Sequence, residues 1–197
     1  MKIKIINGIF ILCLFSISYM QSDTNITTDR LEKIKLLLSE KKDLAPEISL
    51  KSYNDSLFVL SELKGKVVLL NFWATWCGPC RMEIPDFNNL YEKYNDKGFE
   101  ILGISLSDTK QQLVEFSSVY NVKYPLLYGT FKEIDAITRS YGGVPAVPWS
   151  FLIGVEGDII KTYPGAIIAQ WDPVTYQNLI YTIESQLKIQ DNLQDLE

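Results

Sequence analysis

Residues 67–85 of this 197-residue chain read VVLLNFWATWCGPCRMEIP, an apolar run that leads directly into a Cys-x-x-Cys motif. The run over residues 67–73 begins with β-branched side chains and follows Gly65, which predicts a short buried strand. Apolar residues then recur at helical spacing over residues 80–94, which predicts a helix. A strand that feeds Cys-x-x-Cys and then a helix is the context in which this motif indicates redox chemistry.

The two cysteines of the motif have different predicted roles. At a helix start, Cys77 lies near unpaired backbone N–H groups and the positive end of the helix dipole, which both favour the nucleophilic thiolate. Cys80, about one helical turn away, is placed to attack a mixed disulfide and release the partner. An inert structural disulfide is the alternative, but a bridge across three residues closes too small a loop for much entropic stabilisation. We therefore expect Cys77 to be the nucleophile and Cys80 the resolving cysteine of a redox-active disulfide.

The composition argues against several other classes of site. The chain has no histidine, which excludes Cys–His and Ser–His nucleophile pairs and histidine-ligated metals. It has three cysteines, Cys13, Cys77 and Cys80, so a four-ligand zinc site is not expected and we predict no metal. The formal net charge of −5, without a Lys/Arg cluster, argues against a nucleic-acid partner. The length fits one domain with short extensions.

The N-terminal residues have the composition of an export signal. Lysines precede an apolar core over residues 9–17, so we expect residues 1–21 to be a signal peptide or a membrane anchor. The core is short for a membrane span, which favours a cleaved signal over membrane attachment through residues 1–20. A lipoprotein signal at Cys13 is a third alternative, disfavoured by the bulky residue before it. Residues 22–43 follow as a polar and helical extension.

Residues 44–189 have the alternating patterns of one domain, and residues 190–197 form a polar tail. In the helix expected over residues 109–120, Leu113, Phe116 and Val119 should face inward. This order predicts an α/β fold with a central mixed sheet covered by helices on both faces. The expected strands cover residues 48–53, 56–60, 67–73, 99–106, 124–128, 149–155 and 159–163, and the expected helices cover residues 80–94, 109–120 and 131–141 and begin again at 173.

The motif and its surroundings resemble a known group of proteins. Residues 76–80 resemble the active-site motif of the thioredoxin-like superfamily, and the wider sequence resembles extracytoplasmic thiol-disulfide oxidoreductases of the TlpA/ResA type. The resemblance runs over roughly residues 44–188 and implies a thioredoxin-like fold with an N-terminal strand pair. It also implies a strand-helix insertion over residues 108–141. The stretches that carry it are residues 45–50, 60–66, 71–76 and 147–153.

This resemblance assigns further residues to the site. Pro148 resembles the family's cis-proline, which with Val147 faces the active site and offers backbone to the bound partner. An ordinary strand-start proline is the alternative. Gly78 and Pro79 shape the turn between the cysteines, and this Gly-Pro pair resembles that of reducing thioredoxins. Trp76 is expected on the rim that docks a partner chain.

A carboxylate and an amide complete the expected site. Glu83 lies one helical turn after Cys80, and in the ResA-like branch a glutamate at this position tunes cysteine ionisation. An exposed, solvated helix glutamate is the alternative. Asn71 stands where plain thioredoxins have a buried aspartate, and an amide cannot take the proton that this aspartate takes. Trp149 stands where family members commonly have threonine, so the usual partner contact at that position is not expected to be the same.

From these features we expect an exported enzyme that reduces protein disulfides outside the cytoplasm, in the periplasm or at the outer face of the membrane. The resemblance implies no bound cofactor, protein thiol or disulfide substrates such as apocytochrome c in cytochrome c maturation, and electrons from a membrane thiol-disulfide carrier. An oxidase or isomerase with the same site is an alternative. A peroxiredoxin-related peroxidase is another, although the Thr-x-x-Cys pattern of that family is missing. A non-enzymatic thioredoxin-fold binding module is the last.

Overall fold

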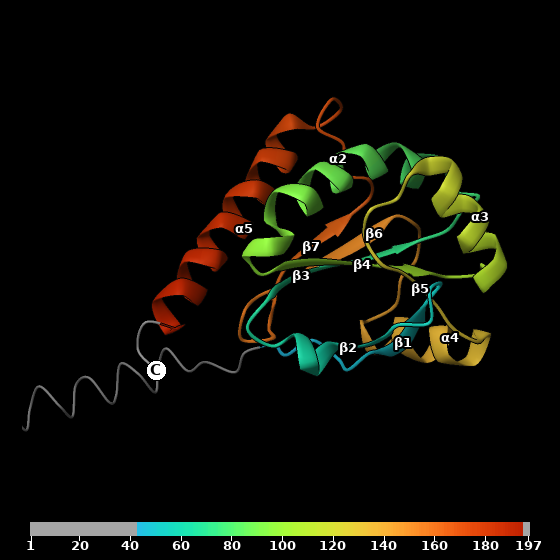
Figure 1. Cartoon of the computed structure of the whole chain (residues 1–197), viewed down its shortest axis with the longest axis horizontal. Coiled ribbons are helices and arrows are strands. Elements are labelled where there is room, and N and C mark those ends of the chain that lie inside the picture. Colours follow the sequence, from blue (N-terminus) through green and yellow to red (C-terminus); the bar gives the residue numbers. More distant parts are fainter. Residues whose placement is uncertain (1–42, 195–197) are drawn as a thin grey trace, which may run out of the picture. The chain divides into compact units, whose positions relative to one another are not determined.

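The protein is described from a computed structural model that defines residues 43–194 (Figure 1). The expected signal or anchor over residues 1–21 lies outside this range, and so does all but the last residue of the expected extension over residues 22–43. Within the described range, no helix is both long enough and apolar enough to cross a membrane.

One mixed sheet of seven strands lies at the centre of the described chain (Figure 1). The strands are β1 (Ser49–Ser52), β2 (Leu57–Val59), β3 (Val67–Trp73), β4 (Phe99–Ser105), β5 (Leu126–Tyr128), β6 (Trp149–Ile153) and β7 (Ile159–Pro164). Their order across the sheet is β2-β1-β5-β4-β3-β6-β7. Strand β3 pairs in parallel with β4 and antiparallel with β6, so the strand before the Cys-x-x-Cys motif lies inside the sheet.

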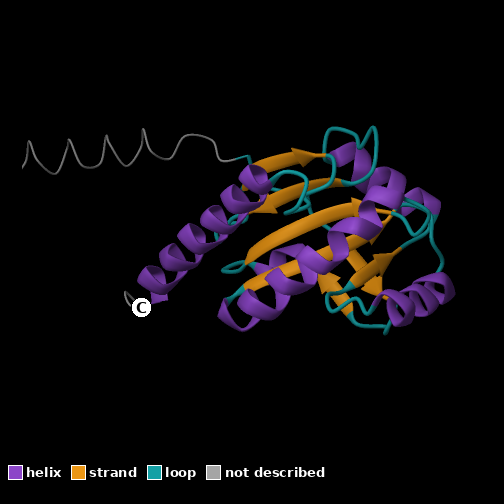
Figure 2. Cartoon of the chain, turned by 90° about the horizontal axis from the view of Figure 1, so that it is seen from above, coloured by secondary structure: helices purple, strands orange, loops and turns teal. Residues whose placement is uncertain are grey.

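Helices cover both faces of the sheet, as the sequence predicted (Figure 2). On one face, apolar side chains of α2, α3 and α5 pack into one cluster, and on the other face α4 and η1 contribute to a second cluster. The α-helices are α2 (Gly78–Tyr94), α3 (Lys110–Tyr120), α4 (Phe131–Ser140) and α5 (Pro173–Gln194), and the 3₁₀ helices are η1 (Leu60–Leu63) and η2 (Asn95–Lys97).

Strand β3 is buried on both faces along its whole length. Val67, Leu69 and Trp73 pack into the cluster beneath α2, whereas Leu70 and Phe72 pack into the cluster on the side of α4. Alternate residues of a strand point to opposite faces, so a strand covered on both sides needs apolar residues at nearly every position. This explains why the sequence of β3 is apolar at every position except Asn71.

Two details of the helices differ from expectation. Val119 was expected to face inward but is 79% exposed. Each step of three residues rotates a side chain backward around a 3.6-residue helix, so two such steps from Leu113 turn Val119 away from the core. The next residue, Tyr120, is 41% exposed and stacks its ring on that of Phe116, with 4.2 Å between ring centroids. Helix α5 runs to Gln194, beyond the expected boundary after residue 189, because residues 190–194 include no helix-breaking glycine or proline.

The packing predicts a large stability loss for one core substitution. Phe72 is fully buried, and its ring contacts those of Tyr141 and Phe151 at centroid distances of 5.8 and 6.0 Å. Phe72→Ala should lower the free energy of unfolding in urea by about 3–5 kcal/mol, because it leaves a cavity. The matched control is Phe131→Ala, since Phe131 is 84% exposed. Its loss should stay within about 0.5 kcal/mol, and equal losses in the two variants would contradict the packing described.

Candidate active site

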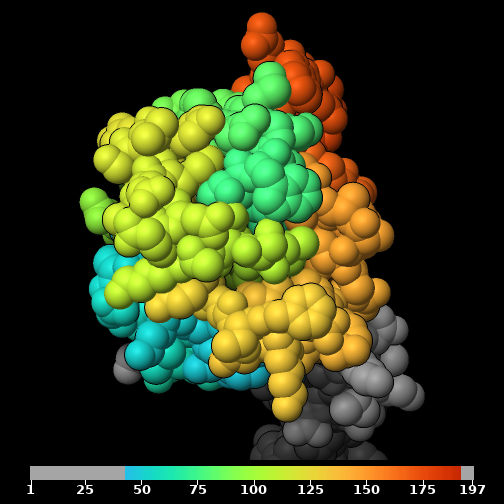
Figure 3. Space-filling view, turned by 90° about the vertical axis from the view of Figure 1, so that its right-hand side faces the viewer, coloured from blue at the N-terminus to red at the C-terminus, as the bar shows by residue number. Residues whose placement is uncertain are grey.

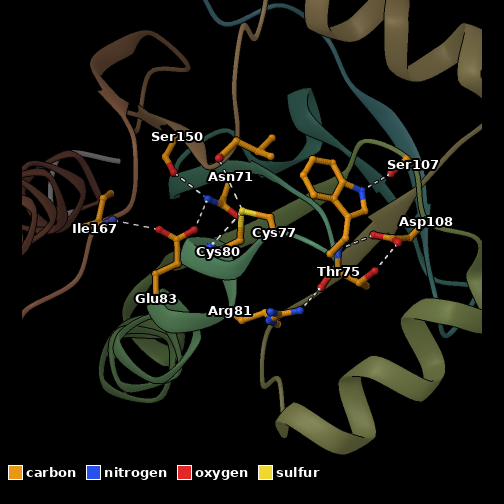
Figure 4. Close-up of a disulfide and its surroundings, with 12 residues drawn as sticks. Asn71, Thr75, Cys77, Cys80, Arg81, Glu83, Ser107, Asp108, Ser150 and Ile167 are labelled. Carbon is orange, nitrogen blue, oxygen red and sulfur yellow. Dashed lines mark hydrogen bonds between the residues drawn. A yellow bond between two sulfur atoms is a disulfide. The ribbon is translucent and has the colours of Figure 1, made fainter.

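The cysteine pair lies at the junction of β3 and α2 (Figure 4). Cys77 is the N-cap residue of α2, and Gly78 and Pro79 are the first two residues of the helix. Cys77 and Cys80 form a disulfide, with 5.3 Å between their Cα atoms. The backbone N–H of Cys80 donates to Cys77 Sγ at 3.2 Å. The Cys77 sulfur therefore occupies the place of a capping acceptor, where the helix dipole and an amide favour a negative charge.

A backbone segment from a distant part of the chain lies against the Cys77 sulfur. The carbonyl oxygen of Val147 is 3.6 Å from Cys77 Sγ, and the Val147–Pro148 peptide bond is cis, as predicted. The pairing of β3 with β6 causes this approach, because it places Trp149 opposite Phe72 at the end of β3. The tertiary structure thus brings together the motif and the proline that the sequence assigned to one site.

Glu83 is buried beneath the cysteine pair rather than solvated. The residue is 1% exposed, which excludes the alternative of an exposed helix glutamate. Its Oε1 accepts from Asn71 Nδ2 and its Oε2 accepts from the backbone N–H of Ile167, each at 3.0 Å. The pKa of Glu83 is raised to about 8, chiefly by burial and to a smaller extent by the nearby Asp86, against the opposing effect of the two N–H donors. A carboxyl group with such a pKa can hold a proton near neutral pH.

Ser150 extends this buried polar group and was not predicted from the sequence. Asn71 Nδ2 donates both to Glu83 Oε1 and to Ser150 Oγ, the latter at 2.9 Å (Figure 4). Asn71 and Ser150 are direct partners in the β3–β6 register, so their side chains share one face of the sheet. A serine within the otherwise apolar run of residues 149–153 was the available signal. Trp149 packs instead against the cluster on the opposite face.

Trp76 lies on the surface beside Cys77, as expected for a docking rim. It is 63% exposed, and its indole N–H donates to Ser107 Oγ at 3.0 Å. Trp73, which ends β3, is only 3% exposed. The exposed ring of Trp76 therefore offers apolar surface next to a cysteine that is itself 4% exposed.

Asp108 is a second carboxylate near the motif that the sequence did not assign to the site. Thr109 is the N-cap of α3, in a capping box with Gln112, so Asp108 lies one residue before the cap. Asp108 is 6% exposed and accepts hydrogen bonds from Thr75, two residues before Cys77. No local sequence pattern around Asp108 indicated its contact with Thr75.

The arrangement suits thiol–disulfide exchange. A capped cysteine can act as the attacking thiolate, a second cysteine is bonded to it, and a buried carboxyl group lies beneath both. Within residues 43–194, no three His, Cys, Asp or Glu side chains form a group that could hold a metal ion.

Comparison with known proteins supports the same chemistry. The chain matches the AhpC/TSA family over residues 42–162. It is 36% identical over 131 residues to the thiol-disulfide oxidoreductase ResA of Bacillus subtilis, covering 66% of this chain and 70% of that protein. Identity to ResA of Bacillus thuringiensis subsp. konkukian is 37% over 121 residues, with 61% and 68% covered. A proposed thiol:disulfide interchange protein DsbE from Chlorobium tepidum is 30% identical, with a TM-score of 0.64 over 75% of this chain and 98% of that structure.

Burial of Glu83 predicts a pH dependence of stability. Its pKa rises from an ordinary 4.5 to about 8 in the folded protein, so the unfolded chain loses this proton first as pH rises. The stabilising contribution is therefore full below pH 4.5 and is lost as pH rises to about 8. The unfolding free energy of wild type minus that of Glu83→Gln should fall by on the order of a few kcal/mol over this range, measured by urea titration.

A second variant controls the sign of this dependence. Hydrogen bonds from Thr130 lower the pKa of Glu133, so its contribution to stability is lost as pH falls rather than as it rises. The corresponding difference for Glu133→Gln should change in the opposite direction, in the acidic range. A difference for Glu83→Gln that stays flat between pH 4.5 and 8 would contradict the buried, proton-holding environment of Glu83.

Proposed function

This chain belongs to the AhpC/TSA family and is a thiol-disulfide oxidoreductase, and on that premise we propose that it reduces protein disulfides outside the cytoplasm. The observation that supports the proposed site most directly is the position of Cys77. It caps α2, its sulfur lies against the carbonyl of Val147, and Cys80 is bonded to it from the more buried side. A partner chain that docks beside Val147 and Pro148 brings its disulfide to the Cys77 sulfur.

The proposed reaction is two successive exchanges. In the reduced enzyme, the Cys77 thiolate attacks one sulfur of the substrate disulfide, which forms a mixed disulfide and releases the other substrate sulfur as a thiolate. The Cys80 thiolate then attacks the Cys77 sulfur, which breaks the mixed disulfide and releases the second substrate thiolate. Two electrons pass to the substrate, two protons complete its thiols, and the enzyme is left with the Cys77–Cys80 disulfide. A dithiol donor must then reduce that disulfide.

We assign Glu83 a proton-holding role in these exchanges. Its raised pKa lies near that of an ordinary thiol, so a proton can pass between the two kinds of group with little change in free energy. Asn71 and Ile167 hold both oxygens of the carboxyl group and so fix its position beneath the cysteines. Asn71 itself cannot take a proton, which makes Glu83 the acidic group of this buried cluster.

The compartment and the direction of transfer rest on the sequence. The apolar core over residues 9–17 supports export by a signal or anchor, and therefore a location in the periplasm or at the outer face of the membrane. The Gly78–Pro79 pair supports a reducing potential, by its resemblance to reducing thioredoxins. An exported reductant needs electrons from a membrane thiol-disulfide carrier. The disulfide of apocytochrome c, whose reduction yields its two thiols, is the substrate that we propose.

The reduction potential of the cysteine pair tests the direction. The full chain is equilibrated with mixtures of reduced and oxidised dithiothreitol or glutathione, and the disulfide fraction is measured by thiol labelling. A reductant should give a potential near that of thioredoxin, about −270 mV. A potential near that of a strong oxidant, about −120 mV, would identify an oxidase or isomerase and overturn the proposed direction.

Single-cysteine variants test the order of attack. Cys80→Ser should accumulate a mixed disulfide with a protein substrate, because Cys77 can attack but nothing resolves the product. Cys77→Ser, the matched control, should form no such adduct and should reduce no insulin. Adduct formation is measured by non-reducing gel electrophoresis and mass spectrometry. Adducts on Cys80 in the Cys77→Ser variant would reverse the assignment of the two cysteines.

The remaining alternatives give different results in the same assays. A peroxidase reduces hydrogen peroxide while its Cys77 thiolate is oxidised, whereas the proposed reductase reduces the disulfides of insulin. A non-enzymatic binding module keeps its biological function when Cys77 is replaced by serine. Complementation of a strain that lacks this protein by the Cys77→Ser variant would therefore overturn the enzymatic proposal.

A further inference from the structure

Asp108, in the connection between β4 and α3, holds the segment that precedes the nucleophile. Its Oδ2 accepts from the backbone N–H of Thr75 at 2.9 Å, and its Oδ1 accepts from Thr75 Oγ1 at 2.6 Å. Ser105 Oγ donates to Oδ2 at 2.6 Å. These partners are all uncharged, so Asp108 is placed as a hydrogen-bond acceptor for a neighbouring loop. A buried carboxylate is costly unless hydrogen bonds compensate it, and here two of its three bonds reach Thr75.

The other polar groups of this segment are also bound. The carbonyl oxygen of Thr75 accepts from Arg81 Nη1 at 3.1 Å, so the N–H, the hydroxyl and the carbonyl of this residue all have partners. The next residue, Trp76, donates from its indole to Ser107 Oγ. Ser107 and Asp108 are neighbours, so one connection fixes both residues that precede Cys77 (Figure 4).

This connection lies on the exposed side of the motif. Figure 3 shows the surface at the start of α2, in green, adjoining the yellow-green surface of residues that follow β4. Trp76 is 63% exposed even though its ring is tethered, so the tether fixes the orientation of apolar surface without burying it. A surface that is already ordered loses less conformational entropy when a partner docks. Thr75 and Trp76 together are called the docking rim below.

We propose that Asp108 is a positioning residue that orders the docking rim and so gives the enzyme its preference for protein disulfides over small ones. This inference rests on the proposed function and deepens it. Asp108 takes no part in the exchange of electrons or protons. It acts through Thr75 and Trp76, which contact a protein chain, whereas a small disulfide reaches the Cys77 sulfur without needing the rim.

The test compares two substrates in single-turnover reactions of the reduced full chain, with insulin as the protein disulfide and dithiodipyridine as the small one. Asp108→Ala should lower the second-order rate constant for insulin about tenfold and leave that for dithiodipyridine within about twofold. Asp108→Asn should restore most of the insulin rate, because an amide can still accept from the Thr75 N–H and donate to its hydroxyl. Thr75→Val, which removes only the hydroxyl, should lower the insulin rate less than Asp108→Ala does.

Two comparisons separate positioning from a general loss of structure. Glu100→Ala is the matched control, because Glu100 is a carboxylate on β4, the strand that leads to Asp108, and is also 6% exposed. Its hydrogen-bond partners are Asn95 and Ile101, which are not part of the rim. It should leave the ratio of the two rate constants unchanged. The double variant Trp76→Ala/Asp108→Ala should lose less insulin activity than the two single losses combined, because Asp108 acts in part through Trp76.

Other outcomes overturn the inference. Equal losses with both substrates would mean that Asp108 acts on the cysteine chemistry, and additive losses in the double variant would mean that it acts apart from Trp76. A changed rate ratio in Glu100→Ala would attribute the effect to stability. Failure of the proposed function looks different, since wild type would then react with dithiodipyridine and not with insulin.

Discussion

Burial of strand β3 on both faces is the constraint on which the site depends. Its side chains alternate between two apolar clusters, and it lies between β4 and β6 in the sheet. A shift of one residue would exchange the two sets of side chains between the faces, so the register is strongly fixed. That register decides that Asn71 faces α2, that Cys77 emerges at the helix start, and that the segment containing Pro148 lies beside it.

The buried polar residues beneath the cysteines show how the core accommodates a proton-holding group. Asn71 joins Glu83 to Ser150, and Ile167 supplies a second N–H from the loop before α5, so neither carboxyl oxygen of Glu83 lacks a partner. An unpaired buried polar group costs about 1–3 kcal/mol, which these bonds avoid. They do not restore the ordinary acidity, because removal from water has the larger effect on the pKa of Glu83. The core therefore tolerates the carboxyl group and keeps its proton affinity high.

Two carboxylates on different elements support the same cysteine in different ways. Glu83 projects from α2 into the core, where its raised pKa suits proton exchange. Asp108 follows β4, and its bonds to Thr75 fix backbone and hydroxyl groups two residues before Cys77. The two carboxylates act differently because different elements carry them. Glu83, one helical turn after the cysteine pair, faces the sheet. Asp108 follows β4 and reaches the loop after the neighbouring parallel strand β3.

The sequence by itself determined those features of the structure that depend on residues close together in the chain. The apolar run of β3, the helix after Cys77 and the helix that ends at Tyr120 are local patterns, and the fold class follows from the order of such elements. The family resemblance placed Pro148 and Glu83 at the site. Only the tertiary structure decided that Glu83 is buried, because the N–H that binds it belongs to Ile167, 84 residues away. The roles of Ser150 and Asp108 were not predicted for the same reason, because Ser150 lies 79 residues from its partner Asn71 and Asp108 lies 33 residues from its partner Thr75. Val119 was wrongly expected to face inward because the three-residue spacing was extended over too many turns of the helix. Residues distant in sequence meet only through strand register and helix packing, which no local pattern specifies.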